Sequence, residues 1–201
     1  MEYLHLEIPL LDQVDIVLRT ETENLKIPAG PNDRVVEVFE GLTYYEMRKN
    51  GTLKVGRLDP KNLPPLFIAM DESSSEGTEV YHSNLRERFL ARDPKVLEGI
   101  LQQTELVKQT RTLLQNNKGD EIGPLMNKNY DIRASLIQLN PKHSIMVERA
   151  RQAGAYAKFA GSGGAIVGTS EPQEIVRVIE ILQGYGYRAF QPTLKEFDNK
   201  G

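Results

Sequence analysis

The chain contains no cysteine, and only three of its 201 residues are histidine. Without thiols, disulfides, thiolate nucleophiles and cysteine-based metal sites are all excluded. The histidines His5, His82 and His143 stand alone, without the H-x-H or H-x-x-x-H spacing that metal ligands often show. We therefore expect each of them to be structural or exposed, and we predict no metal ligands.

Long hydrophobic runs are also missing. No apolar stretch approaches the roughly 20 residues that a membrane helix needs. The first residues, MEYLHLEIPLLDQVD, lack both the basic region and the apolar core of a signal peptide. The formal net charge is −3, and no basic stripe alternates with aromatic residues. These features predict a cytoplasmic protein that binds neither nucleic acid nor a membrane.

What is present suits one domain or two small ones with a real core, since 39% of the residues are hydrophobic. Apolar positions at helical spacing predict a helix from residue 10 to about 24. The segment IPAGPND breaks it, and Asn32 or Asp33 is expected to cap a second helix that ends before Gly41. Residues 42–48 and 52–58 flank a K-N-G turn and predict a β-hairpin.

The turn-rich segment DPKNLPP predicts a domain boundary, which gives domains 1–62 and 63–201. Beyond it we expect a strand at 66–71, a polar loop at 72–83 and mostly helix over 84–153. The helices are expected to break near 93–94, 116–119 and 140–141, and to bury Leu97, Ile100, Leu101, Leu106, Leu113 and Leu114. Strands at 155–159, 164–169 and 187–194 and a helix at 171–186 complete the pattern. It predicts an α+β fold, with helices on one face of a mostly antiparallel sheet.

A glycine-rich loop lies inside KFAGSGGAIVG, residues 158–168. It is not a Rossmann loop, because Ile166 replaces the third glycine and a strand-like run follows, and it lacks the G-K-[ST] of a Walker loop. Two interpretations stay open: a tight hairpin turn, or a nest of backbone N–H groups with Ser162 that binds an anion. Lys158 alone favours neither, since a strand lysine is usually solvated.

A second stretch, AGPNDRVVEVFEGL, places Asp33 at the start of a helix. A carboxylate there either caps the helix or acts as a general base toward a substrate hydroxyl. Taken alone, the position favours capping.

Taken together, the two stretches resemble the GHMP family of small-molecule kinases, and most closely its glucuronokinase branch. The order of several motifs is preserved from about Ile27 to the C-terminus. They are the G-x-x-D-R stretch at 30–34, NLPPLF (62–67), VYHSNLRERF (80–89), MNKNYDIR (126–133) and VERARQAGAYAKFAGSGGA (147–165).

The resemblance implies the end of a GHMP kinase N-terminal (ribosomal S5-like) domain over 1–62 and a ferredoxin-like C-terminal domain over 63–201. It implies an ATP- and Mg²⁺-dependent kinase acting on a sugar hydroxyl, with glucuronate C1 as the expected acceptor. Asp33 is then the candidate catalytic base. The implied substrate and phosphate region consists of Gly30, Arg34, Gly161, Ser162, Gly163 and Gly164. Arg133 either faces an acidic sugar or, as we expect, pairs on the surface or along its helix.

One departure from the family is large. The P-x-G-L-[GS]-S-S-S segment that binds ATP is absent, as is the metal-holding carboxylate that follows it, and ESSSEG (72–77) does not replace them. We therefore expect a kinase fragment that is inactive alone. A split-kinase part, a non-catalytic sugar- or partner-binding module, and another GHMP kinase of the heptose-phosphate or galactose type are the alternatives. Truncation predicts uncovered apolar faces at 4–18 and 42–48 that favour association.

Overall fold

The computed structural model describes the whole chain except residues 1–6, 28, 49–50, 73–78, 162 and 195–201. Contacts within the chain divide it into two compact units, Met1–Pro60 and Lys61–Lys195. The division falls inside the DPKNLPP segment. The two units are described separately here.

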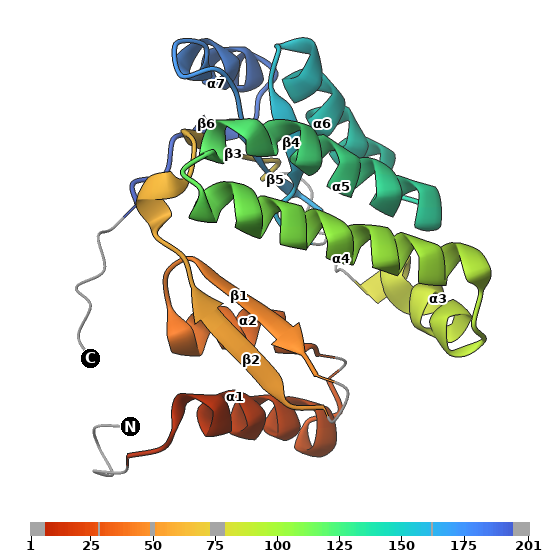
Figure 1. The fold of residues 1–201 in the computed structure, drawn as a ribbon. Coiled ribbons are helices and arrows are strands. Elements are labelled where there is room, and N and C mark those ends of the chain that lie inside the picture. Colours follow the sequence, from red (N-terminus) through yellow and green to blue (C-terminus); the bar gives the residue numbers. More distant parts are fainter. Residues whose placement is uncertain (1–6, 28, 49–50, 73–78, 162, 195–201) are drawn as a thin grey trace. The chain divides into compact units, whose positions relative to one another are not determined.

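The first unit consists of two helices and a hairpin (Figure 1). Their bounds are α1 Leu10–Arg19, which continues as a π-helical turn Thr20–Asn24, α2 Pro31–Phe39, β1 Thr43–Met47 and β2 Leu53–Arg57. The strands pair antiparallel, with Tyr45 opposite Val55. The expected helices and hairpin are therefore confirmed.

The expected cap of α2 is wrong. Gly30 is the N-cap and Pro31 is the first helical residue, so Asn32 and Asp33 lie inside the first turn and no side chain caps the helix. Proline favours this position because its φ is already helical and its missing N–H has no partner to lose.

The two helices of this unit bury Val14 and Val35, which are 1% and 0% exposed. Several other apolar side chains of α1 and β1 are exposed instead. Exposed ones are Leu10, Leu11, Ile16, Val17 and Met47. These agree with the uncovered apolar faces that the sequence predicts, although residues 4–6 lie outside the described part.

The second unit is a four-stranded antiparallel sheet with helices (Figure 1). Its strand order is β4-β5-β3-β6. The bounds are β3 Leu66–Met70, α3 Glu79–Leu90, α4 Pro94–Gln115, α5 Gly123–Leu136, α6 Pro141–Gln152, β4 Tyr156–Phe159, β5 Ala165–Thr169, α7 Ile175–Gly184 and β6 Arg188–Phe190, with short 3₁₀ turns at Pro60–Asn62 and Gly119–Ile122. The α+β class is confirmed.

The core of this unit forms where α6 and α7 cover one face of the sheet. Because side chains alternate along a strand, Phe67 and Ala69 of β3 point into the core while their neighbours do not. Met146 of α6 and Leu182 of α7, both fully buried, pack against them. Burying each such side chain contributes about 1.5–3 kcal/mol.

Two of the expected helix breaks prove to be helix starts with capping side chains. The side chain of Asp93 accepts a hydrogen bond from the backbone N–H of Lys95 at 2.9 Å, and that of Asn140 accepts one from the backbone N–H of Lys142 at 2.9 Å. A proline follows each capping residue. Asp93 also bonds Arg88, and this bond lowers the pKa of the Asp93 carboxyl. Caps of this kind stabilise a helix by about 1 kcal/mol.

Three further expectations need correction. Residues 79–83, expected in a loop, form the first turns of α3. Ile100 and Leu101 are 37% and 70% exposed, because α4 buries the face that carries Gly99 and Leu106, and residues one or two positions from Gly99 turn away from it. The last strand is also shorter than expected.

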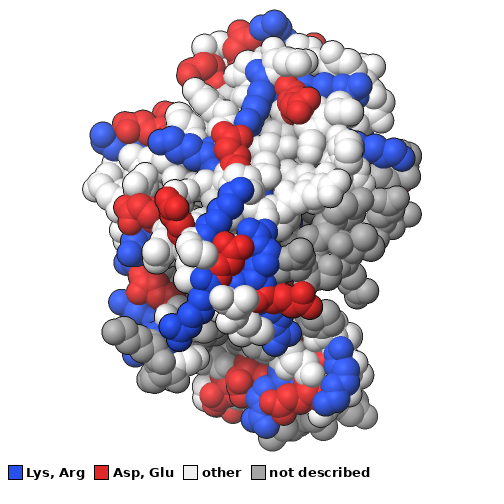
Figure 2. Space-filling view, turned by 90° about the vertical axis from the view of Figure 1, so that its right-hand side faces the viewer, with Lys and Arg blue, Asp and Glu red and all other residues white. Residues whose placement is uncertain are grey.

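No helix in the described part of the chain is long and apolar enough to cross a bilayer. On the face drawn in Figure 2, acidic and basic side chains are interspersed rather than gathered into a broad basic area.

Candidate functional site

The glycine loop connects two antiparallel neighbours, β4 and β5. Their last pair is Phe159 opposite Ile166, and the N–H of Ala160 donates to the carbonyl of Ala165 at 3.0 Å. The loop then turns through Gly163 and Gly164, whose φ angles are +146° and +74°. Side chains other than glycine rarely adopt such angles, so the turn depends on glycine. Ser162 lies outside the described residues.

One side of the loop is packed and the other is open. A Cβ added at Gly163 would stand 2.3 Å from Nδ1 of His143, whereas a Cβ at Gly161 would meet nothing within 4 Å. His143 lies in the first turn of α6, is 6% exposed, and sets its ring edge-on to Phe159. The open side leaves room for a ligand to approach the backbone.

Arg133 of α5 braces the loop. Its Nη1 donates a 2.6 Å hydrogen bond to the carbonyl of Gly161, and its guanidinium lies 5.5 Å from the centre of the Phe159 ring. Burial lowers the pKa of Arg133. The expectation that this arginine pairs on the surface or along its helix missed this contact, because nothing in the spacing of Arg133 and Gly161 shows that they meet.

Lys158 adds a second cation at the start of the loop. Its Nζ donates to the carbonyl of Phe159 at 2.8 Å. Burial, and then the positive charge of Arg133, lower the pKa of Lys158. It is therefore not the solvated strand lysine that the sequence favoured. Two cations beside an open glycine turn create a positive potential that suits phosphate oxygens.

Arg133 lies on α5, and a polar network links this helix to α6 and β4. Arg151 donates to Asn127 Oδ1 at 3.1 Å and to Asp131 Oδ1 at 2.8 Å, and it lies over the Tyr130 ring. Asn127 Oδ1 also accepts the backbone N–H of Ala157 at 3.0 Å. The amide thus satisfies a donor of the edge strand, and the motifs at 126–133 and 147–165 form one structural unit.

Asp33 belongs to the other unit. It lies in the first turn of α2 with its side chain 79% exposed, and its Oδ2 accepts a 3.1 Å hydrogen bond from Nη1 of Arg34. Arg34 also pairs with Glu21, and this hydrogen bond raises the pKa of Arg34. Burial, and then the charge of Asp33, raise the pKa of Tyr45. An exposed carboxylate at a helix start can accept a proton from a bound hydroxyl.

The structure thus gathers the described loop glycines with Arg133, Lys158 and His143. It gathers Gly30, Asp33 and Arg34 separately in the first unit. That these two groups share one site stays a prediction. The sequence missed His143 as a neighbour of the loop, and the only available signal was its place three residues after the Asn140 cap.

The resemblance implies two bound groups, a nucleotide and Mg²⁺, and the described residues suit them unequally. The open, cationic glycine turn fits the phosphates of a nucleotide. In the described ranges, no group of three or more His, Cys, Asp or Glu side chains gathers as a metal site. No residue is therefore assigned to Mg²⁺.

The chain is similar to known kinases over much of its length. Residues 110–188 match the model described as GHMP kinases C terminal. The chain is 37% identical to glucuronokinase 1 of Arabidopsis thaliana over 161 residues. The match covers 76% of this chain and 44% of that protein. The chain thus spans less than half the length of this relative.

Two solved structures share the fold at low sequence identity. A D-glycero-D-manno-heptose 1-phosphate kinase from Bacteriodes thetaiotaomicron has a TM-score of 0.70 at 15% identity, covering 94% of this chain and 54% of its own. Streptococcus pneumoniae phosphomevalonate kinase, in complex with phosphomevalonate and AMPPNP, has a TM-score of 0.75 at 12% identity, covering 95% and 64%. Residues 110–188 therefore carry the C-terminal domain of the GHMP kinases.

Proposed function

We propose that this chain forms part of an ATP-dependent sugar kinase that phosphorylates glucuronate, or a related sugar, at the C1 hydroxyl. The observation that carries the proposal is the glycine loop braced by Arg133 and Lys158, in a chain that is 37% identical to a glucuronokinase. Because the chain covers only 44% of that relative, other segments of the full enzyme are expected to contribute to the site.

In the proposed reaction the sugar hydroxyl oxygen attacks the γ-phosphorus of ATP, and the bond between this phosphorus and the β,γ-bridging oxygen breaks. Asp33 takes the hydroxyl proton, and ADP leaves. Phosphoryl transfer depends chiefly on positioning and charge stabilisation. The backbone N–H groups of Gly161, Gly163 and Gly164, with Ser162 and the two cations, supply the latter. Gly30 and Arg34 hold Asp33 in place. Mg²⁺ bound with the nucleotide would neutralise phosphate charge.

A second candidate is a non-catalytic module that binds a sugar or a partner. The absence of a P-x-G-L-[GS]-S-S-S segment from residues 1–201 favours it, since the family uses that segment to bind ATP. This candidate predicts sugar binding, with or without nucleotide, and no phosphoryl transfer in a chain completed by the missing segment. Other GHMP kinases, of the heptose-phosphate or galactose type, differ from the main proposal only in their acceptor.

The test joins this chain to the segment of Arabidopsis glucuronokinase 1 that precedes the matched region, and measures ADP release with several sugars. We expect transfer to glucuronate that falls at least 100-fold in Asp33→Asn, in line with loss of a general base. Arg177→Gln, which changes an exposed α7 ion pair, is the matched control and should keep full activity. Preferred transfer to galactose, a heptose phosphate or mevalonate would contradict the acceptor.

Calorimetry on the 201-residue chain alone separates the main proposal from a self-sufficient kinase. We expect no binding of Mg-ATP, because no family-type ATP loop is present. Clear Mg-ATP binding would show that another segment cradles the nucleotide, and the account of an incomplete site would be wrong.

A further inference from the structure

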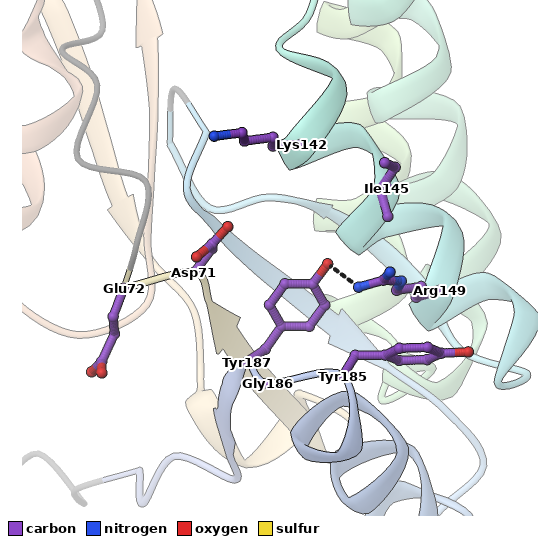
Figure 3. Close-up of a pocket in the computed structure, with 8 residues that line it drawn as sticks. All are labelled: Asp71, Glu72, Lys142, Ile145, Arg149, Tyr185, Gly186 and Tyr187. Atoms are coloured by element: carbon purple, nitrogen blue, oxygen red, sulfur yellow. Dashed lines mark hydrogen bonds between the residues drawn. The ribbon is translucent and has the colours of Figure 1, made fainter.

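A pocket of about 510 Å³ opens in the Lys61–Lys195 unit, beside the glycine loop (Figure 3). One wall is a single face of α6, which presents Lys142, Ile145 and Arg149 at spacings of three and four residues. The other wall holds Asp71, just after β3, and Tyr187, just before β6. The volume lies within the range of about 300–1,000 Å³ that small-molecule sites occupy.

Arg149 is held in place by aromatic rings rather than by a carboxylate. Its guanidinium lies 4.1 Å from the centre of the Tyr185 ring, and its Nη1 donates to the Tyr187 hydroxyl at 2.7 Å (Figure 3). Other half-buried arginines of this unit, Arg88 and Arg151, pair instead with aspartates. The tyrosines fix the direction of the Arg149 fork but leave its charge uncompensated.

The charges of the pocket favour one negative charge on the ligand. Within the described residues, neither Lys142 nor Arg149 forms an ion pair, and Glu72 at the rim pairs with Arg188 at 3.1 Å. That leaves two cations against the single carboxylate of Asp71. A surplus of one positive charge suits a monoanion better than a pyrophosphate, because a pyrophosphate carries more negative charge than the pocket would neutralise.

The remaining polar groups suit hydroxyls. The Tyr187 oxygen accepts from Arg149 and keeps its own proton to donate. The Asp71 carboxylate points into the pocket from the opposite wall (Figure 3), and a carboxylate has about four acceptor positions. Ile145, 41% exposed, adds an apolar surface for a ring face. A hydroxyl-rich ring matches the Tyr187 hydroxyl, the Asp71 carboxylate and the apolar surface of Ile145. One carboxylate on that ring matches the surplus positive charge.

We propose that this pocket binds a uronate, with its carboxylate on Arg149 and its hydroxyls on Asp71 and Tyr187. The ligand is of the same class as the acceptor proposed above, and in that respect the inference rests on the proposed function. The charge and hydroxyl arguments come from the pocket alone.

The pocket is joined to the glycine loop at two points. The backbone N–H of Asp71 donates to the carbonyl of Gly164 at 2.9 Å. Lys142 precedes His143, whose ring packs against Gly163. Occupation of the pocket therefore alters the surroundings of the loop, and the signals of both should change together.

The test is a titration of the ¹⁵N-labelled chain by NMR, without ATP, using glucuronate, glucose and acetate as probes. We expect glucuronate to shift the amide signals of Asp71, Gly164 and Gly186 to saturation, with glucose and acetate each at least tenfold weaker. Arg149→Gln should weaken glucuronate at least tenfold and leave glucose unchanged. Tyr187→Phe, which keeps the ring and loses the hydroxyl, should weaken glucuronate about threefold or more, and Arg177→Gln should change nothing.

Equal affinity for glucose and glucuronate would overturn the proposal, as would acetate binding as tightly as glucuronate, or shifts that avoid the pocket. A well-dispersed Arg149→Gln spectrum with unchanged glucuronate affinity would do so as well. Because no nucleotide is present, this outcome is independent of the transfer assay. Uronate binding here without phosphoryl transfer in the joined chain would sink the proposed function alone.

Discussion

The guanidinium of Arg133 reaches across 28 residues of sequence to hold the carbonyl of Gly161 at 2.6 Å. Helix α5 of the second unit is thereby fastened to the turn between β4 and β5. Burial, and then the positive charge of the same arginine, lower the pKa of Lys158. One side chain therefore shapes the loop and adds to its positive potential.

Loss of this brace should loosen the loop without unfolding the unit. In Arg133→Gln, a hydrogen bond from a charged donor disappears, worth about 1.5–3 kcal/mol locally. We expect hydrogen exchange of the backbone amides at 160–165 to speed up roughly tenfold or more, since 1.4 kcal/mol corresponds to a factor of ten. Amides of α7 serve as the internal reference. Unchanged exchange at the loop would show that Arg133 does not hold it.

The two glycines of the loop should differ sharply in their tolerance of a side chain. Gly163→Ala forces an L-residue to a φ of +146° and places Cβ against His143, so we expect a loss of about 1–3 kcal/mol or more in the free energy of unfolding. Gly161→Ala, with open space around it, should cost less than about 0.5 kcal/mol. Urea denaturation measures both. Adding His143→Ala to Gly163→Ala should recover only the part due to the clash, and equal costs for the two glycines would refute the described turn.

Lys158 should give the fold a characteristic pH dependence. Its pKa is lowered in the folded protein, so the unfolded chain binds this proton more tightly. The free energy of unfolding should therefore rise with pH from the lowered pKa up to the ordinary value of 10.5. In Lys158→Met that contribution is absent. In urea denaturation from pH 7 to 10, the free energy of unfolding of the wild type should rise relative to that of the variant. Parallel curves would contradict the burial of the amine.

Much of the fold follows from local chemistry that the sequence displays. Asp93-Pro94 and Asn140-Pro141 mark helix starts because a capping side chain followed by proline satisfies a helix N-terminus. Short, nearly continuous apolar runs mark β3 and β5. The start of α2 was misplaced because two signals compete there, and Pro31 outweighs Asn32 or Asp33 as the point where the helix begins.

The parts that escaped prediction depend on contacts between distant segments. Nothing near Leu101 in sequence shows that α4 packs by its Gly99 side, where Leu136 of α5 comes close. The same holds for the site. The glycines and Asp33 were found from motif resemblance, whereas the roles of Arg133, Lys158 and His143 at the loop appear only once α5, α6 and β4 are assembled.

The proposed reaction requires Asp33 and the glycine loop to act on the same substrate. The chain has no cysteine, so the double variant Asp33→Cys/Gly161→Cys carries the only two thiols, both at exposed positions. We expect a short bis-maleimide to link them efficiently in the folded protein and poorly in urea, with each single variant as control. Failure to crosslink while both thiols react fully with a monofunctional maleimide would contradict the shared site.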